Sequence, residues 1–192
     1  MKREPQTGER PATARLTFEP VTRARWADFA KLFEAPGGPK YCWCMAWRTT
    51  SAETRQIGKG SRRPLMQSRV EAGTPVGLLG YLDGDPVAWV SIAPRDTYRD
   101  LGGPDAEGGE VIWSLVCMYV RRQHRGEGRG TELIEAATAY ARKRGATVLE
   151  AYPVDPQSPS YRFMGFVPAF ERLGFKPHGT AGARRHIMRL AL

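Results

Sequence analysis

VCMYVRRQHRGEGRGTELIEAA, residues 116–137, is the most informative segment of this sequence. It begins inside an almost wholly apolar run, residues 111–120, which is typical of a buried central strand. A basic turn rich in glycine follows, and an amphipathic sequence then predicts a helix that ends at Gly145. This order favours an anion-binding loop, because glycines let the backbone approach a ligand closely and a helix N-terminus carries partial positive charge.

Two common nucleotide-binding patterns fit this turn badly. A dinucleotide fold places its glycines after the first strand, with an acidic residue about 20 positions later, whereas this turn follows several predicted strands. A Walker-type loop needs a lysine before its serine or threonine, but Thr131 follows Gly130 directly. The turn therefore belongs to another class of anion site.

Residues 125–130 read RGEGRG and match in full the pattern Arg/Gln-x-x-Gly-x-Gly/Ala. Between an apolar strand and an amphipathic helix, this motif resembles the signature of the GNAT superfamily, the acyl-CoA-dependent N-acetyltransferases. AYPVD (151–155) and FERLGF (170–175) resemble the family's next strand and its closing helix. WVSIAP (89–94) and CWCM (42–45) resemble one bacterial branch of the superfamily.

The resemblance implies an α/β fold with a central mixed, mostly antiparallel sheet of about seven strands, flanked by about four helices, with splayed strands at its centre. It also implies acetyl-CoA as cosubstrate, with Met118 and Val120 pairing with the pantetheine arm as an added strand. The pyrophosphate would be held by the backbone and by charge-assisted bonds from two arginine side chains. The residues that the resemblance assigns to it are Arg125, Gly126, Gly128, Arg129, Gly130 and Thr131.

The remaining sequence predicts one domain over residues 14–192, because the polar residues 1–13, with two prolines, read as a disordered tail. Alternating or continuous apolar runs predict the other strands, and apolar residues at helical spacing predict the helices. Strands are expected at 15–22, at 146–155 and at 184–192, a hairpin at 75–94, and helices at 23–34, at 51–73 in two pieces, and at 167–173.

The net charge of +9 implies an anionic ligand or partner. Basic residues are scattered rather than arranged in a stripe with interleaved aromatics, which disfavours nucleic acid. No apolar run approaches the about 20 residues of a membrane span, and the N-terminus lacks the apolar segment of a secretory signal. We therefore expect a cytoplasmic protein with no nucleic-acid or membrane partner; a homodimer is left open.

Acetyl transfer to an amine needs a neutral amine, a stabilised oxyanion and a protonated leaving thiolate. In the GNAT family a Glu on the central strand is often the base, but Ser114 occupies the usual position, so Glu110 at the mouth of the strand is the candidate base. A solvated loop carboxylate is the alternative. The family's usual acid is a Tyr, and Phe170 stands in its place. Tyr161 is the candidate substitute, ahead of Tyr152, with packing as the alternative for both.

YCWCMAWR, residues 41–48, concentrates cysteines and aromatics. A zinc site wants four ligands, and Cys42 and Cys44 are too close together for a standard pair, so no metal is expected. A disulfide between them would be strained. Packing in the core remains one interpretation; the other is the wall of an acceptor site for an apolar or aromatic amine, formed by Trp43, Trp47 and Arg48, with Arg48 clamping a carboxylate. Cys117 is expected to pack as a small apolar residue.

The sequence thus predicts an N-acetyltransferase that moves an acetyl group from acetyl-CoA to a primary amine of a small molecule, by direct transfer in a ternary complex. One alternative keeps the fold and takes a protein lysine or N-terminus as acceptor. Another is a catalytically silent acyl-CoA-binding regulatory module, which the replaced tyrosine and the absent strand glutamate would suit.

Overall fold

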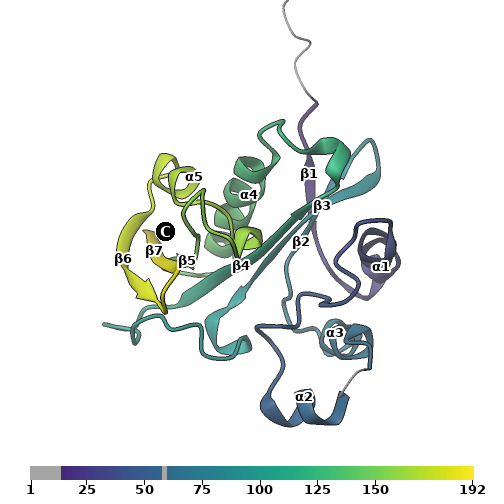
Figure 1. Cartoon of the computed structure of the whole chain (residues 1–192), viewed down its shortest axis with the longest axis horizontal. Helices are drawn as coiled ribbons and strands as arrows, with labels where there is room; N and C mark the ends of the chain where they lie inside the picture. The colour runs from purple at the N-terminus through teal and green to yellow at the C-terminus, as the bar shows by residue number, and fades with distance from the viewer. Residues whose placement is uncertain (1–13, 58–59) are drawn as a thin grey trace, which may run out of the picture.

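The computed structural model describes residues 14–57 and 60–192, so the predicted tail lies outside the described residues. The described residues form a seven-stranded sheet in the order β1-β2-β3-β4-β5-β7-β6, together with five α-helices (Figure 1). The strands are β1 Thr17–Pro20, β2 Leu78–Leu82, β3 Asp85–Pro94, β4 Ile112–Val120, β5 Val148–Ala151, β6 Lys176–Ala181 and β7 Arg185–Ala191. The helices are α1 Trp26–Glu34, α2 Ser51–Ile57, α3 Arg63–Glu71, α4 Arg129–Lys143 and α5 Val167–Arg172.

The sheet is mixed, because β4 and β5 run parallel while every other neighbouring pair is antiparallel. The α/β class and the mostly antiparallel sheet are confirmed. The helices number five rather than about four, and the expected two-piece helix at 51–73 is α2 followed by α3. The 75–94 hairpin is β2 and β3, joined at Asp83 and Gly84, both of which have a positive φ.

The two central strands separate at one end, as the resemblance implied. Pairing between β4 and β5 ends at Leu115 and Ala151, whereas β4 continues to Val120. A bulge lies at the point of separation: Ile92 and Ser91 on β3 face Leu115 and Cys117, which leaves Val116 as the extra residue of β4. The C-terminal half of β4 therefore keeps β3 on one side and leaves its other edge free of β5.

Helices cover both faces of the sheet (Figure 1). Leu133 and Ile134 of α4, with Phe170 of α5, belong to the same buried cluster as Val90 and Leu115 of the sheet. On the opposite face, α1 and α3 enclose an aromatic cluster formed around Phe29, Phe33, Trp43 and Trp89. Each such fully buried side chain stabilises the fold by about 1.5–3 kcal/mol. These two cores hold β4 rigidly between them.

Candidate functional site

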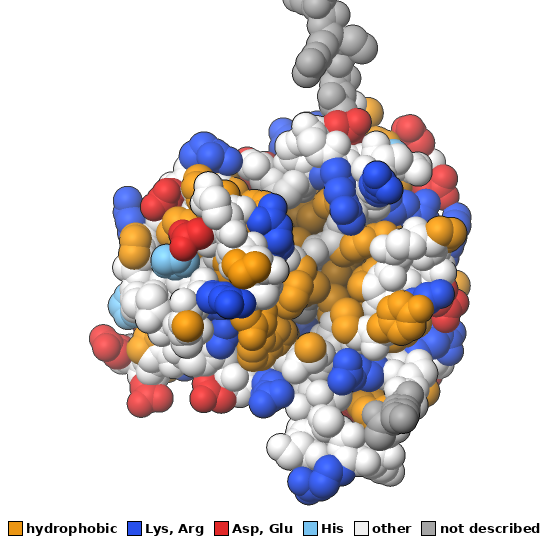
Figure 2. All heavy atoms as spheres, in the orientation of Figure 1, with side chains coloured by type: hydrophobic (Ala, Val, Ile, Leu, Met, Phe, Trp, Pro, Cys, Tyr) orange, Lys and Arg blue, Asp and Glu red, His pale blue; other side chains and the backbone are white. Residues whose placement is uncertain are grey.

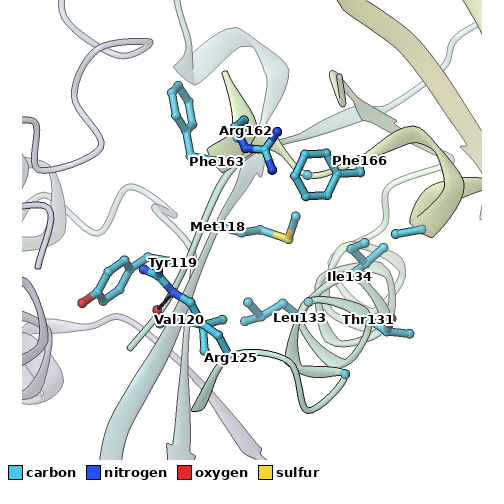
Figure 3. A pocket seen from close by; sticks show the side chains of 14 residues that line it. Met118, Tyr119, Val120, Arg125, Thr131, Leu133, Ile134, Arg162, Phe163 and Phe166 are labelled. Carbon is cyan, nitrogen blue, oxygen red and sulfur yellow. Dashed lines mark hydrogen bonds between the residues drawn. The ribbon is translucent and has the colours of Figure 1, made fainter. Parts of the chain in front are cut away.

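A cavity of about 600 Å³, hereafter the large cavity, opens where β4 leaves β5 (Figure 3). It lies between the C-terminal half of β4, the loop and first turns of α4, and the segment 162–169. Its lining residues are Met118, Tyr119, Val120, Arg125, Gly128, Gly130, Thr131, Leu133, Ile134, Arg162, Phe163, Gly165, Phe166 and Ala169. Five of the predicted site residues thus line this cavity together with Met118, whose side chain points into the space between β4 and α4 (Figure 3).

The glycine loop has the geometry of an anion cradle. Gly126 and Gly128 adopt φ values of 81° and 79°, a region that only glycine occupies freely. A Cβ atom added at Gly126, Gly128 or Gly130 would meet nothing within 4 Å, so this backbone borders open space. Within the described part of the chain, no acceptor bonds to the backbone N–H of Gly126, Glu127 or Gly128. Such free amides at the start of a fifteen-residue helix suit a phosphate.

Arg125 lines the large cavity, as predicted from the sequence. Its Nε donates to the carbonyl of Val120 at 2.9 Å, and its guanidinium lies 6.0 Å from the ring centroid of Tyr119 (Figure 3). The remaining guanidinium N–H groups have no acceptor among the described residues. Arg125 can therefore offer charge-assisted bonds to an anion in the loop.

The side chain of Arg129 does not have the position that the sequence predicted. Its side chain is 3% exposed, donates to the carbonyl of Ala14 at 2.7 Å, and forms ion pairs with Glu127 at 3.1 Å and Glu132 at 2.9 Å. It does not line the large cavity, because these partners hold it against the segment before β1. The prediction that its guanidinium adds a bond to the anion is wrong; only its backbone N–H, at the helix start, remains for that role.

The segment 162–169 is the wall that the sequence analysis missed. Gly165 lets it approach β4: its φ is 87°, and a Cβ there would lie 2.6 Å from Cε of Met118 and 2.8 Å from Cε2 of Phe170. Arg162 stacks over Phe166, with its guanidinium 4.7 Å from the ring centroid. The sequence signal was the glycine set between aromatics in RFMGF, residues 162–166.

A smaller cavity of about 220 Å³, hereafter the small cavity, adjoins the large one. The two share Met118, Tyr119 and Phe163, so they meet beside the C-terminal half of β4. In Figure 2, hydrophobic side chains gather in a hollow across the middle of the molecule, with Lys and Arg side chains at its rim. The small cavity is lined by Pro39, Cys42, Cys44, Ala46, Trp47, Ser91, Val116, Cys117, Met118, Tyr119 and Phe163.

The predicted wall 41–48 is divided between cavity and core. Trp47 lines the small cavity. Trp43 is 2% exposed and stacks on Phe33 at 5.3 Å between ring centroids, so the prediction that it lines a pocket is wrong: it is core. Arg48 is buried behind the wall and donates to Oγ of Ser91 at 3.0 Å and to the hydroxyl of Tyr98 at 2.7 Å. Burial lowers the pKa of Arg48.

All three cysteines are free and line the small cavity. The fold brings Sγ of Cys44 to 3.2 Å from Sγ of Cys117, although 73 residues separate them. Sγ of Cys44 also accepts a hydrogen bond from Nε1 of Trp89 at 3.2 Å. The pKa of Cys44 lies well above the usual thiol value, first because it donates to Cys117 and also because it is buried. This grouping has no counterpart in the sequence analysis.

The two catalytic candidates do not reach the cavities. Glu110, two residues before β4, forms an ion pair with Arg189 at 3.2 Å. Tyr161, with φ 58°, lies 6.3 Å from Trp47 between ring centroids. Neither side chain lines the large or the small cavity. Their roles as base and acid stay predictions without a contact to support them.

A buried carboxylate lies elsewhere in the sheet. Glu150 of β5 is fully buried, accepts from Nε of Arg189 at 2.8 Å and from the hydroxyl of Tyr152, and pairs in register with Ser114. Burial, followed by the charge of Glu150, raises the pKa of Tyr152. These groups hold one another inside the sheet and line neither cavity.

Residues 23–175 match the family described as Acetyltransferase (GNAT) family, so the chain belongs to the GNAT acetyltransferases. Among solved structures, the chain is similar to the PaiA N-acetyltransferase of Thermoplasma acidophilum in complex with coenzyme A, with 14% identity, TM-score 0.52, and 92% of this chain and 99% of that chain covered.

It is also similar to YncA of Salmonella typhimurium, a putative acetyltransferase with its cofactor acetyl-CoA (18% identity, TM-score 0.55, coverage 93% and 95%). A third similar structure is a GNAT family acetyltransferase of Brucella melitensis in complex with acetyl-CoA (17% identity, TM-score 0.51, coverage 92% and 88%). No curated protein matches.

No helix in residues 14–57 and 60–192 has the length and apolarity to cross a membrane. In the same residues, no group of three or more His, Cys, Asp or Glu side chains is placed to hold a metal ion.

Proposed function

We propose that this GNAT protein transfers an acetyl group from acetyl-CoA to the primary amine of a small molecule with an apolar body. The observation that carries the proposal is the junction of the two cavities at Met118, Tyr119 and Phe163. A thioester carried through the large cavity and an amine held in the small cavity would meet there. Direct transfer within a ternary complex follows from this juxtaposition.

The large cavity fits coenzyme A in three respects. Its glycine loop offers unbonded backbone amides to a pyrophosphate, with Arg125 and Arg162 at the wall. The edge of β4 beyond Leu115 is free of β5, so the backbone of Met118 and Val120 can pair with the amides of a pantetheine arm. The net charge of +9 also favours a polyanionic cosubstrate.

The small cavity supports an acceptor that is small and apolar. Its volume of about 220 Å³ is below the roughly 300–1,000 Å³ of pockets for drug-sized ligands. No Asp or Glu among the described residues lines it, so an ammonium group would lose its hydration there without gaining a carboxylate partner. The amine would therefore bind uncharged, which is the form that attacks a thioester.

The chemistry at the junction would begin with attack of the neutral amine on the thioester carbonyl. A backbone N–H of β4 near the Val116 bulge would donate to the developing oxyanion. The carbon–sulfur bond then breaks and its electron pair leaves with the sulfur of coenzyme A. The nitrogen loses one proton as the amide forms, and the leaving sulfur takes up a proton. Residues of both cavities thus position reactants, while the main chain stabilises charge.

The test is turnover on a panel of acceptors. The protein is incubated with acetyl-CoA and phenethylamine, hexylamine, spermidine or a lysine-containing peptide, and N-acetylated products are quantified by mass spectrometry. We expect kcat/KM for phenethylamine or hexylamine to exceed the other two by about tenfold or more, a difference of about 1.4 kcal/mol. Preference for the peptide would replace the small-molecule acceptor with a protein. Acetyl-CoA binding without product from any amine would indicate the silent module.

A further inference from the structure

The two cavities offer few groups that can carry a proton. In the part of the chain that the structure describes, neither cavity is lined by Asp, Glu or His. Their titratable lining side chains are two arginines, which stay protonated, one tyrosine and three cysteines. The tyrosine is Tyr119, which lines both cavities, but its hydroxyl points away from Met118, where the two cavities meet, in Figure 3. The thiols therefore remain as the proton carriers beside the reaction centre.

Among the thiols, Cys117 has the best position. It follows the bulge residue Val116 on β4, precedes the shared residue Met118, and is only partly buried. The S–H of Cys44 donates to Sγ of Cys117 at 3.2 Å, while the indole N–H of Trp89 donates to Sγ of Cys44 and orients it. Negative charge on the sulfur of Cys117 would thus find a donor already in place.

A buried cation lies behind the same wall. Arg48 is 3% exposed, and its hydrogen-bond acceptors in the described residues are hydroxyls and a carbonyl, with no carboxylate. Its Nε has no partner among those residues. One of its acceptors, Ser91, is the register partner of Cys117 across β3 and β4. Arg48 therefore places an unneutralised positive charge behind the wall that carries Cys117.

We propose that Cys117 is the general acid of the transfer and that Cys44 and Arg48 position it and stabilise its thiolate. As the carbon–sulfur bond of the tetrahedral adduct breaks, the electron pair goes to the sulfur of coenzyme A and the thiol proton of Cys117 moves to that sulfur. The nitrogen of the new amide then gives up its extra proton to the Cys117 thiolate, which restores the thiol. No further reactant is needed.

This inference rests on the proposed function, and its first test is the pair Cys117→Ala and Cys117→Ser. Both variants are expected to lower kcat about 100-fold, the low end of what a general acid contributes. The dissociation constant for acetyl-CoA, measured by calorimetry, should stay within about threefold, which also shows that the variants fold. The assay uses acetyl-CoA with the amine of the panel above that is acetylated fastest.

The pH dependence of kcat separates this role from a structural one. A general acid works only while it is protonated, so kcat of the wild type should fall on the alkaline side as the donor thiol loses its proton. This alkaline limb should vanish in Cys117→Ala and Cys117→Ser. In Cys44→Ala kcat should fall about tenfold, because the thiolate of Cys117 loses a donor.

Cys42→Ala is the matched comparison. Cys42 is also a thiol of the small cavity but has no bond to Cys117, since its sulfur contacts the carbonyl of Pro39 and the backbone N–H of Cys44. Its loss should change the KM for the amine and leave the alkaline limb in place.

Three results would overturn the proposal. One is a Cys117→Ala variant that keeps kcat within about threefold of wild type and retains the alkaline limb. Another is an acetylated Cys117 found by peptide mass spectrometry after incubation with acetyl-CoA alone, which would make the residue a covalent relay instead. The third is a wild type that acetylates no amine, which removes the proposed function itself; the first two leave that function standing.

Discussion

The two cavities that meet at Met118 are built in opposite ways. The large cavity takes its anion-binding part from one continuous stretch, residues 125–131, and from backbone groups that only glycines leave accessible. The small cavity takes side chains from 39–47, 91, 116–119 and 163, four segments far apart in the chain. A site made of local backbone leaves its mark in the sequence as a glycine spacing, whereas a site made of distant side chains leaves none. Four sets of variants test whether the two cavities are built and act in these different ways.

Gly128→Val should have the largest effect. Gly84 in the β2–β3 hairpin is the matched control, because its φ is 82° against 79° for Gly128 and a Cβ at either position would meet nothing within 4 Å. Valine at each position should strain the backbone by about 1–3 kcal/mol. The two variants should therefore show similar decreases in Tm. Only Gly128→Val should raise the Kd for acetyl-CoA, by about 100-fold or more, or about 2.7 kcal/mol. Equal Kd values for the two variants would refute the anion cradle.

Trp47→Ala tests the small cavity alone. Removing this ring from the wall should raise the KM for the amine about 10- to 30-fold, since about 1.4–2 kcal/mol of apolar contact is lost. The Kd for acetyl-CoA should stay within about threefold. Trp26→Ala is the control, because Trp26 packs against Trp43 and lines neither cavity; it should lower Tm without raising KM. Steady-state kinetics on both variants measures these KM values. An unchanged KM in Trp47→Ala would show that Trp47 does not contact the acceptor.

Gly165→Ala should disturb both cavities, because the added methyl group would press on Met118 where they meet. We expect about tenfold increases in both the Kd for acetyl-CoA and the KM for the amine, about 1.4 kcal/mol each. Gly174 has the same φ of 87°, but the nearest atom to its Cβ, on Leu190, is 3.7 Å away. Gly174→Ala should therefore share the loss in Tm and leave both binding steps unchanged. An effect of Gly165→Ala on one cavity only would show that the two are independent.

The two arginines of the motif should give the smallest effects on binding and opposite effects on stability. Arg125→Ala should raise the Kd for acetyl-CoA about three- to tenfold, by loss of an exposed charge at the loop, with little change in Tm. Arg129→Ala should lower Tm by about 10 °C, because it leaves Glu132 without its buried partner, while changing Kd less than Arg125→Ala does. Calorimetry and thermal unfolding measure both, and a larger Kd change in Arg129→Ala would restore that side chain to the anion site.

Arg125 and Arg129 differ in how well the sequence predicts the positions of their side chains. Both occur in a basic, glycine-rich turn, so both were assigned to the anion. Arg129 is the first residue of α4. The acids that form ion pairs with it, Glu127 and Glu132, lie two positions before it and three positions after it in the sequence. The sequence shows this spacing, but it does not show whether the side chain pairs with these acids or points to a ligand. The carbonyl of Ala14, which only folding brings close, accepts a hydrogen bond from Arg129 and holds it beside the acids.

The fold class was predictable for a different reason. The buried strand, the glycine turn and the amphipathic helix each carry a periodicity or a backbone requirement that acts over a few neighbouring residues. The bulge at Val116 depends on the pairing of β4 with β3, so its position could not be predicted from local sequence, and the splitting of β4 from β5 was predicted only through the family resemblance.

Local patterning and the backbone freedom of glycine specify the α/β architecture, the position of the glycine loop and the family, so these could be predicted from the amino-acid sequence. Packing between distant segments places Trp43 in the core and Trp47 at the small cavity, holds Arg129 in ion pairs away from the large cavity, and brings Cys44 to Cys117. Side-chain pockets arise from packing between segments that are distant in the sequence, and these segments come into contact only when the sheet forms.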